Sequence, residues 1–129
     1  MKIDHIGIAV KDLETAIKAY KGLNLEVTST DTVAGEGVKV AFLPVGEIRI
    51  ELLQAINPDS IMVKFIEKRG EGVHHIAFKV ENIKEAMNMA KENGLQLIDE
   101  KPRQGAHGSM VAFVHPKSTH GVLIEFVQD

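Results

Sequence analysis

Two histidines and two glutamates are the residues of this chain best suited to do chemistry, because they recur at matching places. His5 and His75 open two similar apolar stretches, and Glu51 and Glu125 lie in two others. Imidazole nitrogens and carboxylate oxygens together suit a divalent metal ion. Brought together by pseudo-two-fold symmetry, the four side chains predict a six-coordinate centre with two positions left open for a substrate.

The recurrence is part of an internal repeat. His5 and His75 are separated by 70 residues (75 − 5), and the same offset pairs a run of further positions of similar character. These are Asp12 with Asn82, Leu13 with Ile83, Ala16 with Ala86, Ile17 with Met87 and Leu25 with Leu95. Each copy therefore opens with a histidine strand and closes with a glutamate strand.

A lone histidine or glutamate in a strand is more often a structural or surface residue than a ligand, and the joint recurrence is what favours a metal. Strand alternation points His74 away from His75, so we interpret His74 as structural or as a support for the ligands. His107 lies in a flexible Gly-Ala-His-Gly loop that could close over a ligand. His115 and His120 are interpreted as solvated.

The elements that must position these residues follow β-α-β-β-β order in each copy. Apolar alternation predicts strands, and apolar residues at helical spacing ending at Gly22 and Gly94 predict the helices. The predicted strands cover residues 3–10, 25–32, 38–43, 48–54, 73–80, 95–99, 110–115 and 122–127, and the predicted helices begin after Asp12 and Asn82. We expect one domain over residues 1–129, made of module 1 (1–56), a connecting helix (57–70) and module 2 (71–129).

Composition is that of a folded globular chain. Of 129 residues, 44% are hydrophobic and 26% are charged, and each half is too short to be reliably stable alone. The absence of cysteine excludes disulfides and thiolate ligands. A formal net charge of −3 argues against a nucleic acid partner, and the absence of a membrane span or signal pattern predicts a cytoplasmic protein.

Several stretches together resemble the methylmalonyl-CoA epimerases of the vicinal oxygen chelate (glyoxalase) superfamily. They are DHIGIAV at 4–10, ELL at 51–53, GVHHI at 72–76, GAHG at 105–108, HPK at 115–117 and GVLIE at 121–125. The resemblance implies an α+β fold in which two tandem βαβββ modules form a curved eight-stranded mixed sheet. It also implies a homodimer, and one divalent ion per chain held by His5, Glu51, His75 and Glu125. Cobalt is the ion we expect first, with manganese, nickel or zinc as alternatives.

The implied activity is interconversion of (2R)- and (2S)-methylmalonyl-CoA, a reaction of propionate metabolism. Removal of the α-proton gives an enolate that a cation stabilises, and reprotonation on the opposite face completes epimerisation. Glu125 and Glu51 are the candidate bases. Some relatives carry a further acid on the third strand where this chain has Val40, which leaves a metal-bound carboxylate, or another acid such as the nearby Glu36, as the base.

The acyl-coenzyme A substrate needs cations for its phosphates. Lys101, Arg103 and Lys117 flank the loops expected to border the site, and His107 lies in one of these loops. We expect these four residues to bind the substrate.

Two other functions stay open at this point. A glyoxalase I-like lactoylglutathione lyase would use the same fold and a similar set of ligands. A small-molecule binding protein of this fold would perform no chemistry, and the four retained ligand-type residues argue against it.

Overall fold

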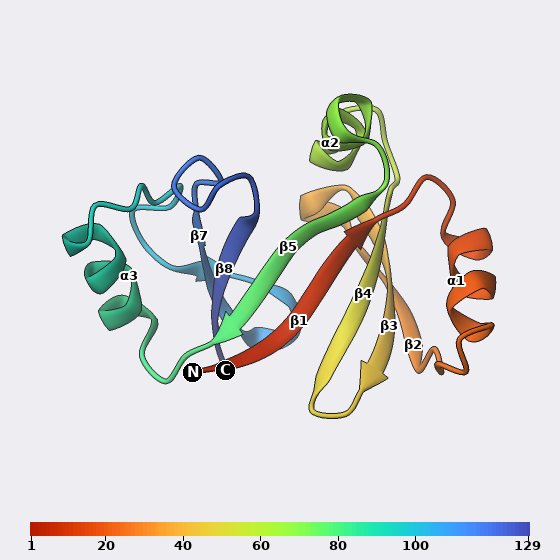
Figure 1. Ribbon diagram of the computed structural model, residues 1–129, viewed down its shortest axis with the longest axis horizontal. Coiled ribbons are helices and arrows are strands. Elements are labelled where there is room, and N and C mark those ends of the chain that lie inside the picture. The colour runs from red at the N-terminus through yellow and green to blue at the C-terminus, as the bar shows by residue number, and fades with distance from the viewer. The chain divides into compact units, whose positions relative to one another are not determined.

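A computed structural model describes all residues, 1–129, as eight β-strands and three α-helices (Figure 1). The elements are β1 (Lys2–Ala9), α1 (Leu13–Lys21), β2 (Ser29–Val33), β3 (Val38–Val45), β4 (Ile48–Ala55), α2 (Ile61–Arg69), β5 (Gly72–Lys79), α3 (Ile83–Glu92), β6 (Arg103–Gln104), β7 (Met110–Val114) and β8 (Leu123–Gln128). Two 3-10 turns, η1 (Ala34–Glu36) and η2 (Ala106–Gly108), lie in loops. The strands form a mixed sheet of order β2-β3-β4-β1-β5-β8-β7-β6.

The chain divides into two compact units. The first unit consists of residues 5–74, and the second consists of residues 1–4 together with residues 75–129. The first residues of β1 therefore belong to the second unit, and the first residues of β5 belong to the first.

The first unit buries both faces of its strands. β1 runs parallel to β4, and β3 pairs antiparallel with both β4 and β2. One face, with Ala41, Leu43 and Leu52, packs against the apolar side of α1. The other face, with Phe42 and Leu53, packs against α2, and strand alternation places Glu51 on this second face.

The second unit repeats this arrangement. β5 runs parallel to β8, and β7 pairs antiparallel with β8. Ala112 and Phe126 face α3 and form the larger core cluster. The opposite face packs Ala77, Phe113 and Val127 together, and alternation places Glu125 on this face.

A glutamine at the end of each glutamate strand caps the first helix of its unit. The Gln54 side-chain oxygen accepts a hydrogen bond of 2.6 Å from the Leu13 N–H, and Gln128 accepts one of 2.8 Å from the Ile83 N–H. Asp12 occupies the predicted N-cap position of α1 but makes no side-chain cap bond. The N-terminus of each helix is thereby fixed to the strand that carries the glutamate.

The strand predicted over residues 25–32 starts later, at Ser29. Thr28 still donates its backbone N–H to the Phe42 carbonyl at 3.0 Å. Leu25 and Val27 instead pack into the core cluster beneath α1. Their apolar alternation therefore reflects packing on a helix rather than pairing in the sheet.

The prediction of a strand over residues 95–99 is wrong, because the structure has no regular strand there. Only a single bridge, Leu97 to Val114, forms there. The Asp99 carboxylate accepts the N–H of Phe113 at 2.8 Å, so a side chain occupies a position that a backbone carbonyl would take in a ladder. The short strand β6 forms instead inside the predicted loop of residues 101–109, where it pairs with β7.

Candidate metal centre

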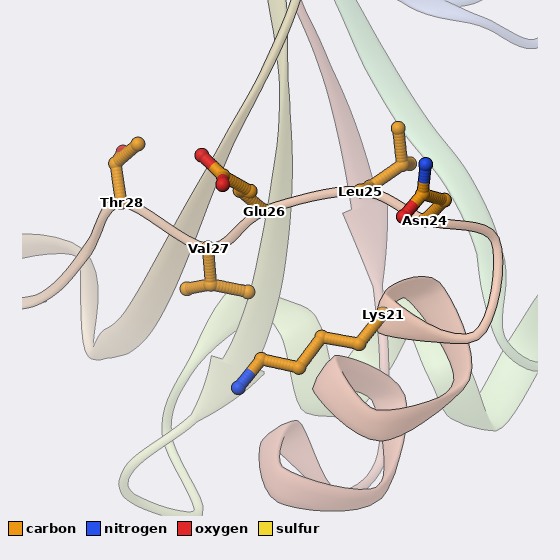
Figure 2. A pocket seen from close by; sticks show the side chains of 6 residues that line it. All are labelled: Lys21, Asn24, Leu25, Glu26, Val27 and Thr28. Carbon is orange, nitrogen blue, oxygen red and sulfur yellow. The ribbon is translucent and has the colours of Figure 1, made fainter.

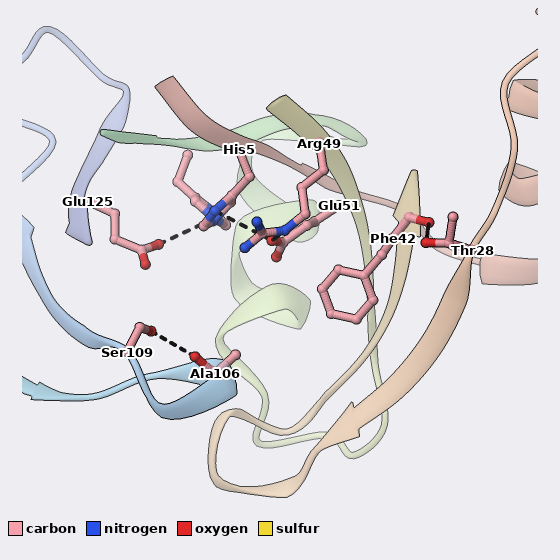
Figure 3. A network of polar contacts seen from close by, with 9 residues as sticks. His5, Thr28, Phe42, Arg49, Glu51, Ala106, Ser109 and Glu125 are labelled. Atoms are coloured by element: carbon pink, nitrogen blue, oxygen red, sulfur yellow. Dashed lines mark hydrogen bonds and ion pairs between the residues drawn. The ribbon is translucent and has the colours of Figure 1, made fainter. Parts of the chain in front are cut away.

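The first unit holds one histidine–glutamate pair. His5 comes from β1 and Glu51 from the parallel strand β4, and both side chains are buried. His5 Nδ1 lies 3.4 Å from Glu51 Oε2 (Figure 3). Gly7 is the register partner of Glu51, so the position beside the carboxylate carries no side chain.

The second unit holds an equivalent pair. His75 comes from β5 and Glu125 from the parallel strand β8, and both are buried. His75 Nε2 lies 3.5 Å from Glu125 Oε1. Ala77, another small residue, is the register partner of Glu125. The structure thus brings each predicted histidine ligand together with the predicted glutamate of its own unit.

The two pairs fit the donor set of a divalent ion. A carboxylate that is nine-tenths buried is costly unless a cation or hydrogen bonds compensate it. At 3.4 Å and 3.5 Å, each imidazole nitrogen lies close enough to the carboxylate oxygen of its unit for the two to be neighbouring ligands of one ion. Neutral imidazole and carboxylate are ligands that cobalt, manganese, nickel and zinc all accept.

An aromatic ring and an arginine lie beside the first carboxylate. Phe42 on β3 is the register partner of Glu51. Arg49 donates from Nε to Glu51 Oε2 at 2.9 Å, and its guanidinium lies 6.0 Å from the centre of the Phe42 ring (Figure 3). Arg49 was not among the predicted site residues, although its place two residues before Glu51 on the same strand face is a signal of this contact in the sequence.

The second unit has a related arrangement built from different positions. Phe113 on β7 is the register partner of Glu125. The guanidinium of Arg103 lies 5.0 Å from the Phe113 ring centre, and its Nε lies 3.2 Å from Asp99 Oδ1. Here the arginine pairs with an aspartate on a neighbouring segment rather than with the buried glutamate.

Comparison with known proteins places this chain in a family. Residues 4–113 match the Glyoxalase/Bleomycin resistance protein/Dioxygenase superfamily. The human mitochondrial methylmalonyl-CoA epimerase is 37% identical over 98% of this chain and 73% of its own length. The ethylmalonyl-CoA/methylmalonyl-CoA epimerase of Cereibacter sphaeroides is 38% identical over 98% of this chain and 97% of its own. The chain belongs to the methylmalonyl-CoA epimerase family.

A solved structure of that family is similar to this chain over the full length of this chain. The Streptomyces coelicolor methylmalonyl-CoA epimerase (E43L) in complex with 2-nitronate-propionyl-CoA superimposes with a TM-score of 0.92 at 36% identity, covering all of this chain and 94% of that one. The predicted family, the α+β fold of two tandem βαβββ modules and the enzyme class are confirmed.

The epimerase-family loop around His107 is held tightly. Gly105 donates its N–H to the Ser109 carbonyl at 2.9 Å, and the Ser109 hydroxyl donates to the Ala106 carbonyl at 2.7 Å (Figure 3). His107 itself adopts a left-handed conformation with φ of 57°, which is uncommon for a residue other than glycine. A Cβ on Gly105 would lie only 2.6 Å from a methyl group of Val111. The backbone therefore presents the exposed His107 from a constrained turn.

The other predicted substrate-binding residues are cationic and accessible. Lys101 and Lys117 are exposed, and the Arg103 side chain is 57% exposed. Arg103 is held by Asp99 and Phe113, while Lys117 donates its backbone N–H to His115 Nδ1 at 3.0 Å.

The histidine next to the second pair has a different environment. His74 makes an edge contact with Phe65 of α2, with ring centres 4.8 Å apart. Burial lowers the pKa of His74 from 6.5 to about 4, so the ring is neutral at pH 7. This contact agrees with a structural role for His74.

The position where some relatives carry an acid is part of the core. Val40 on β3 is 2% exposed and packs with Ala9, Leu53 and Met62. Glu36 lies on the exposed turn η1. The buried carboxylates described in the two units are therefore those of Glu51 and Glu125.

A surface hollow of about 500 Å³ lies between the end of α1 and the segment that follows it (Figure 2). Its lining residues are Lys21, Asn24, Leu25, Glu26, Val27 and Thr28. None of the predicted ligands or substrate-binding residues is among them.

A helix that crosses a membrane must be both long enough and apolar enough to span it. None of the three helices meets both requirements.

Proposed function

We propose that this protein interconverts (2R)- and (2S)-methylmalonyl-CoA with one divalent ion held by His5, Glu51, His75 and Glu125. The observation that carries the proposal is the same buried histidine–glutamate pair in both units of an epimerase-family chain. One pair alone offers two ligands, and two pairs related by the repeat offer four. Four protein ligands would leave two positions of a six-coordinate ion for the substrate.

The reaction begins at the carbon between the thioester carbonyl and the carboxylate of the substrate. A divalent ion supplies positive charge for the oxygens that become more negative as the proton leaves. Glu125 takes this proton as the base, and Glu51 in its protonated form donates a proton to the opposite face of the carbon, which completes the inversion. A base on each side is what inversion requires, and the repeat supplies two carboxylates.

Burial of the two glutamates favours this chemistry. Water around a carboxylate would compete for the proton and weaken the attraction between fixed charges and the reacting oxygens. Glu51 and Glu125 are 8% and 7% exposed. The register partners Phe42 and Phe113 keep the same strand face apolar on each side.

The choice of ion depends on cellular supply as well as on the ligands. Cobalt is our first expectation, and manganese, nickel and zinc accept the same nitrogen and oxygen donors.

The residues proposed to bind the coenzyme A portion of the substrate are His107, Lys101, Arg103 and Lys117. Three of these residues carry positive charge suited to phosphate groups. The Phe113 ring and Asp99 hold the Arg103 guanidinium in one place, which lowers the entropy that is lost when it binds an anion. His107 is presented by the constrained turn of residues 105–109.

A homodimer and a cytoplasmic location belong to the same proposal. The homodimer rests on the resemblance to epimerases noted in the sequence, and the cytoplasmic location rests on the separate expectation stated in the sequence analysis. Light scattering of the purified protein tests the dimer, which predicts twice the chain mass of 14.2 kDa.

Incubation of the cobalt-loaded protein with one epimer of methylmalonyl-CoA in deuterated water tests the reaction. We expect deuterium at the methyl-bearing carbon and conversion towards an equal mixture of epimers. Methylglyoxal with glutathione serves as the comparison substrate, and we expect no turnover of it. Absence of exchange above the uncatalysed rate, with the ion confirmed in place, would overturn the proposed activity.

A further inference from the structure

Each of the two buried glutamates has a histidine partner, His5 for Glu51 and His75 for Glu125, but the residues at one neighbouring register position differ. Arg49 binds Glu51 at 2.9 Å. Strand register shows what occupies the equivalent place in the second unit: His5 is the partner of Arg49, and His75 is the partner of Leu123. At this register position the first unit therefore carries an arginine and the second unit carries a leucine.

Arg49 is itself held in position. It shares a strand face with Glu51, and the Phe42 ring lies beneath its guanidinium at 6.0 Å. Its side chain is 33% exposed, whereas that of Glu51 is 11% exposed. The arginine thus reaches from the accessible edge of this face to a buried carboxylate.

We propose that Arg49 is a positioning residue that holds Glu51 in the orientation needed to bind the metal ion. This inference rests on the metal centre proposed above. Carboxylates that bind metals are themselves commonly hydrogen-bonded, and loss of such an outer partner typically costs about 10- to 100-fold in metal affinity or activity. The planar guanidinium suits this role because its donors have a fixed geometry.

Electrostatics alone predicts the opposite effect. Arg49 places a positive charge beside a ligand for a cation, and its removal would strengthen cation binding through Coulomb attraction. Orientation and charge therefore give changes of opposite sign. The sign of the change in affinity distinguishes a positioning role from a bystander charge.

The test is a competition titration of the metal-free full-length chain with Co²⁺ and a chelating dye. We expect Arg49→Leu, which copies the second unit, to bind Co²⁺ about 10- to 100-fold more weakly than the wild type. Arg49→Lys keeps the charge without the planar fork and should recover part of the loss. Arg103→Leu is the matched control, because Arg103 also lies on a phenylalanine and pairs with a carboxylate, that of Asp99. Its Co²⁺ affinity should stay within about 3-fold of wild type, below the loss expected for an outer partner.

Thermal unfolding in the presence of chelator separates positioning from folding. A purely structural role would lower the unfolding temperature of the metal-free Arg49→Leu protein without a selective loss of affinity at 25 °C. If that variant does not fold, Arg49→Gln is used instead, since it keeps a donor of smaller reach. Unchanged or tighter Co²⁺ binding by the folded variant overturns the role of Arg49 while the metal centre stands. Absence of Co²⁺ binding by the wild type overturns both.

Discussion

His75 Nε2 lies 3.5 Å from Glu125 Oε1, and both side chains are buried in the second unit. His74, the preceding residue, packs its ring against Phe65 instead. Two adjacent histidines on one strand therefore serve opposite faces, as the period of two residues requires. This difference makes them a matched pair for experiments.

Replacement of His75 should remove the metal ion. His75→Ala takes away one proposed ligand, and we expect the affinity for Co²⁺ to fall by more than about 100-fold, beyond the effect of losing an outer partner. Metal analysis after loading and dialysis measures this. His74→Phe is the control, because it keeps an aromatic ring against Phe65 and should retain about one ion per chain. Full occupancy in His75→Ala would contradict the proposed centre.

Replacement of Glu125 should affect turnover more than substrate binding. Glu125→Gln keeps the shape and an oxygen ligand but cannot accept the proton, and general bases commonly contribute about 10²- to 10⁴-fold to the rate. We expect kcat to fall by that order while KM changes little. Metal content is measured in the same sample. Activity near the wild-type value would assign the base to another residue.

The half-buried ring of His74 predicts a loss of stability in acid. Its pKa is about 4 in the folded protein and 6.5 in the unfolded chain, so only the unfolded chain takes up a proton between these values. Stability is therefore fully present above pH 6.5 and declines as pH falls towards 4. From pH 7.5 to pH 5.0 the free energy of unfolding should fall by up to about 2 kcal/mol from this residue.

Urea unfolding of the metal-free protein at both pH values measures that decline. His74→Phe cannot titrate at this position, so its free energy of unfolding should fall by correspondingly less. Equal declines in the two proteins would mean that His74 does not contribute.

Gln54 and Gln128 should stabilise the folded protein to a similar extent, because each caps the N-terminus of a helix. Gln54→Leu and Gln128→Leu each leave the first N–H of a helix without its side-chain acceptor, and we expect a loss of about 1 kcal/mol in each case. Urea denaturation measures the change. Gln104 on the short strand β6 is exposed, so Gln104→Leu should change stability by less than about 0.5 kcal/mol. A loss in the control equal to that in the cap variants would refute the capping role.

Much of the fold could be predicted because the repeat reinforces each local pattern. A strand of β-branched and apolar residues is ambiguous alone, but a second copy with the same pattern supports its assignment as a strand. The alternation placed His5 on the same strand face as Gly7 and Ala9, and His5 and His75 are both buried in the structure. The repeat also predicted that each half opens with a histidine strand and closes with a glutamate strand, and the structure pairs these two strands in parallel in each unit.

Interactions between distant residues could not be predicted in this way. Gln54 and Gln128 cap helices 41 and 45 residues away, whereas sequence rules look for a cap in the residue just before the helix. Asp99 ends a predicted strand by accepting a hydrogen bond from Phe113, 14 residues away. Arg49 was missed for a different reason, since an arginine beside a glutamate on a strand is usually a surface ion pair.

The division of β1 and β5 between the two units has a consequence for any attempt to separate the two repeats. Residues 1–4 belong with the second unit, and residues 72–74 belong with the first. Scission of the polypeptide after Gly70 would therefore give two fragments, each lacking a strand end that the other carries. Neither fragment would carry every residue of its own unit, so the boundary between the sequence repeats does not coincide with the boundary between the structural units.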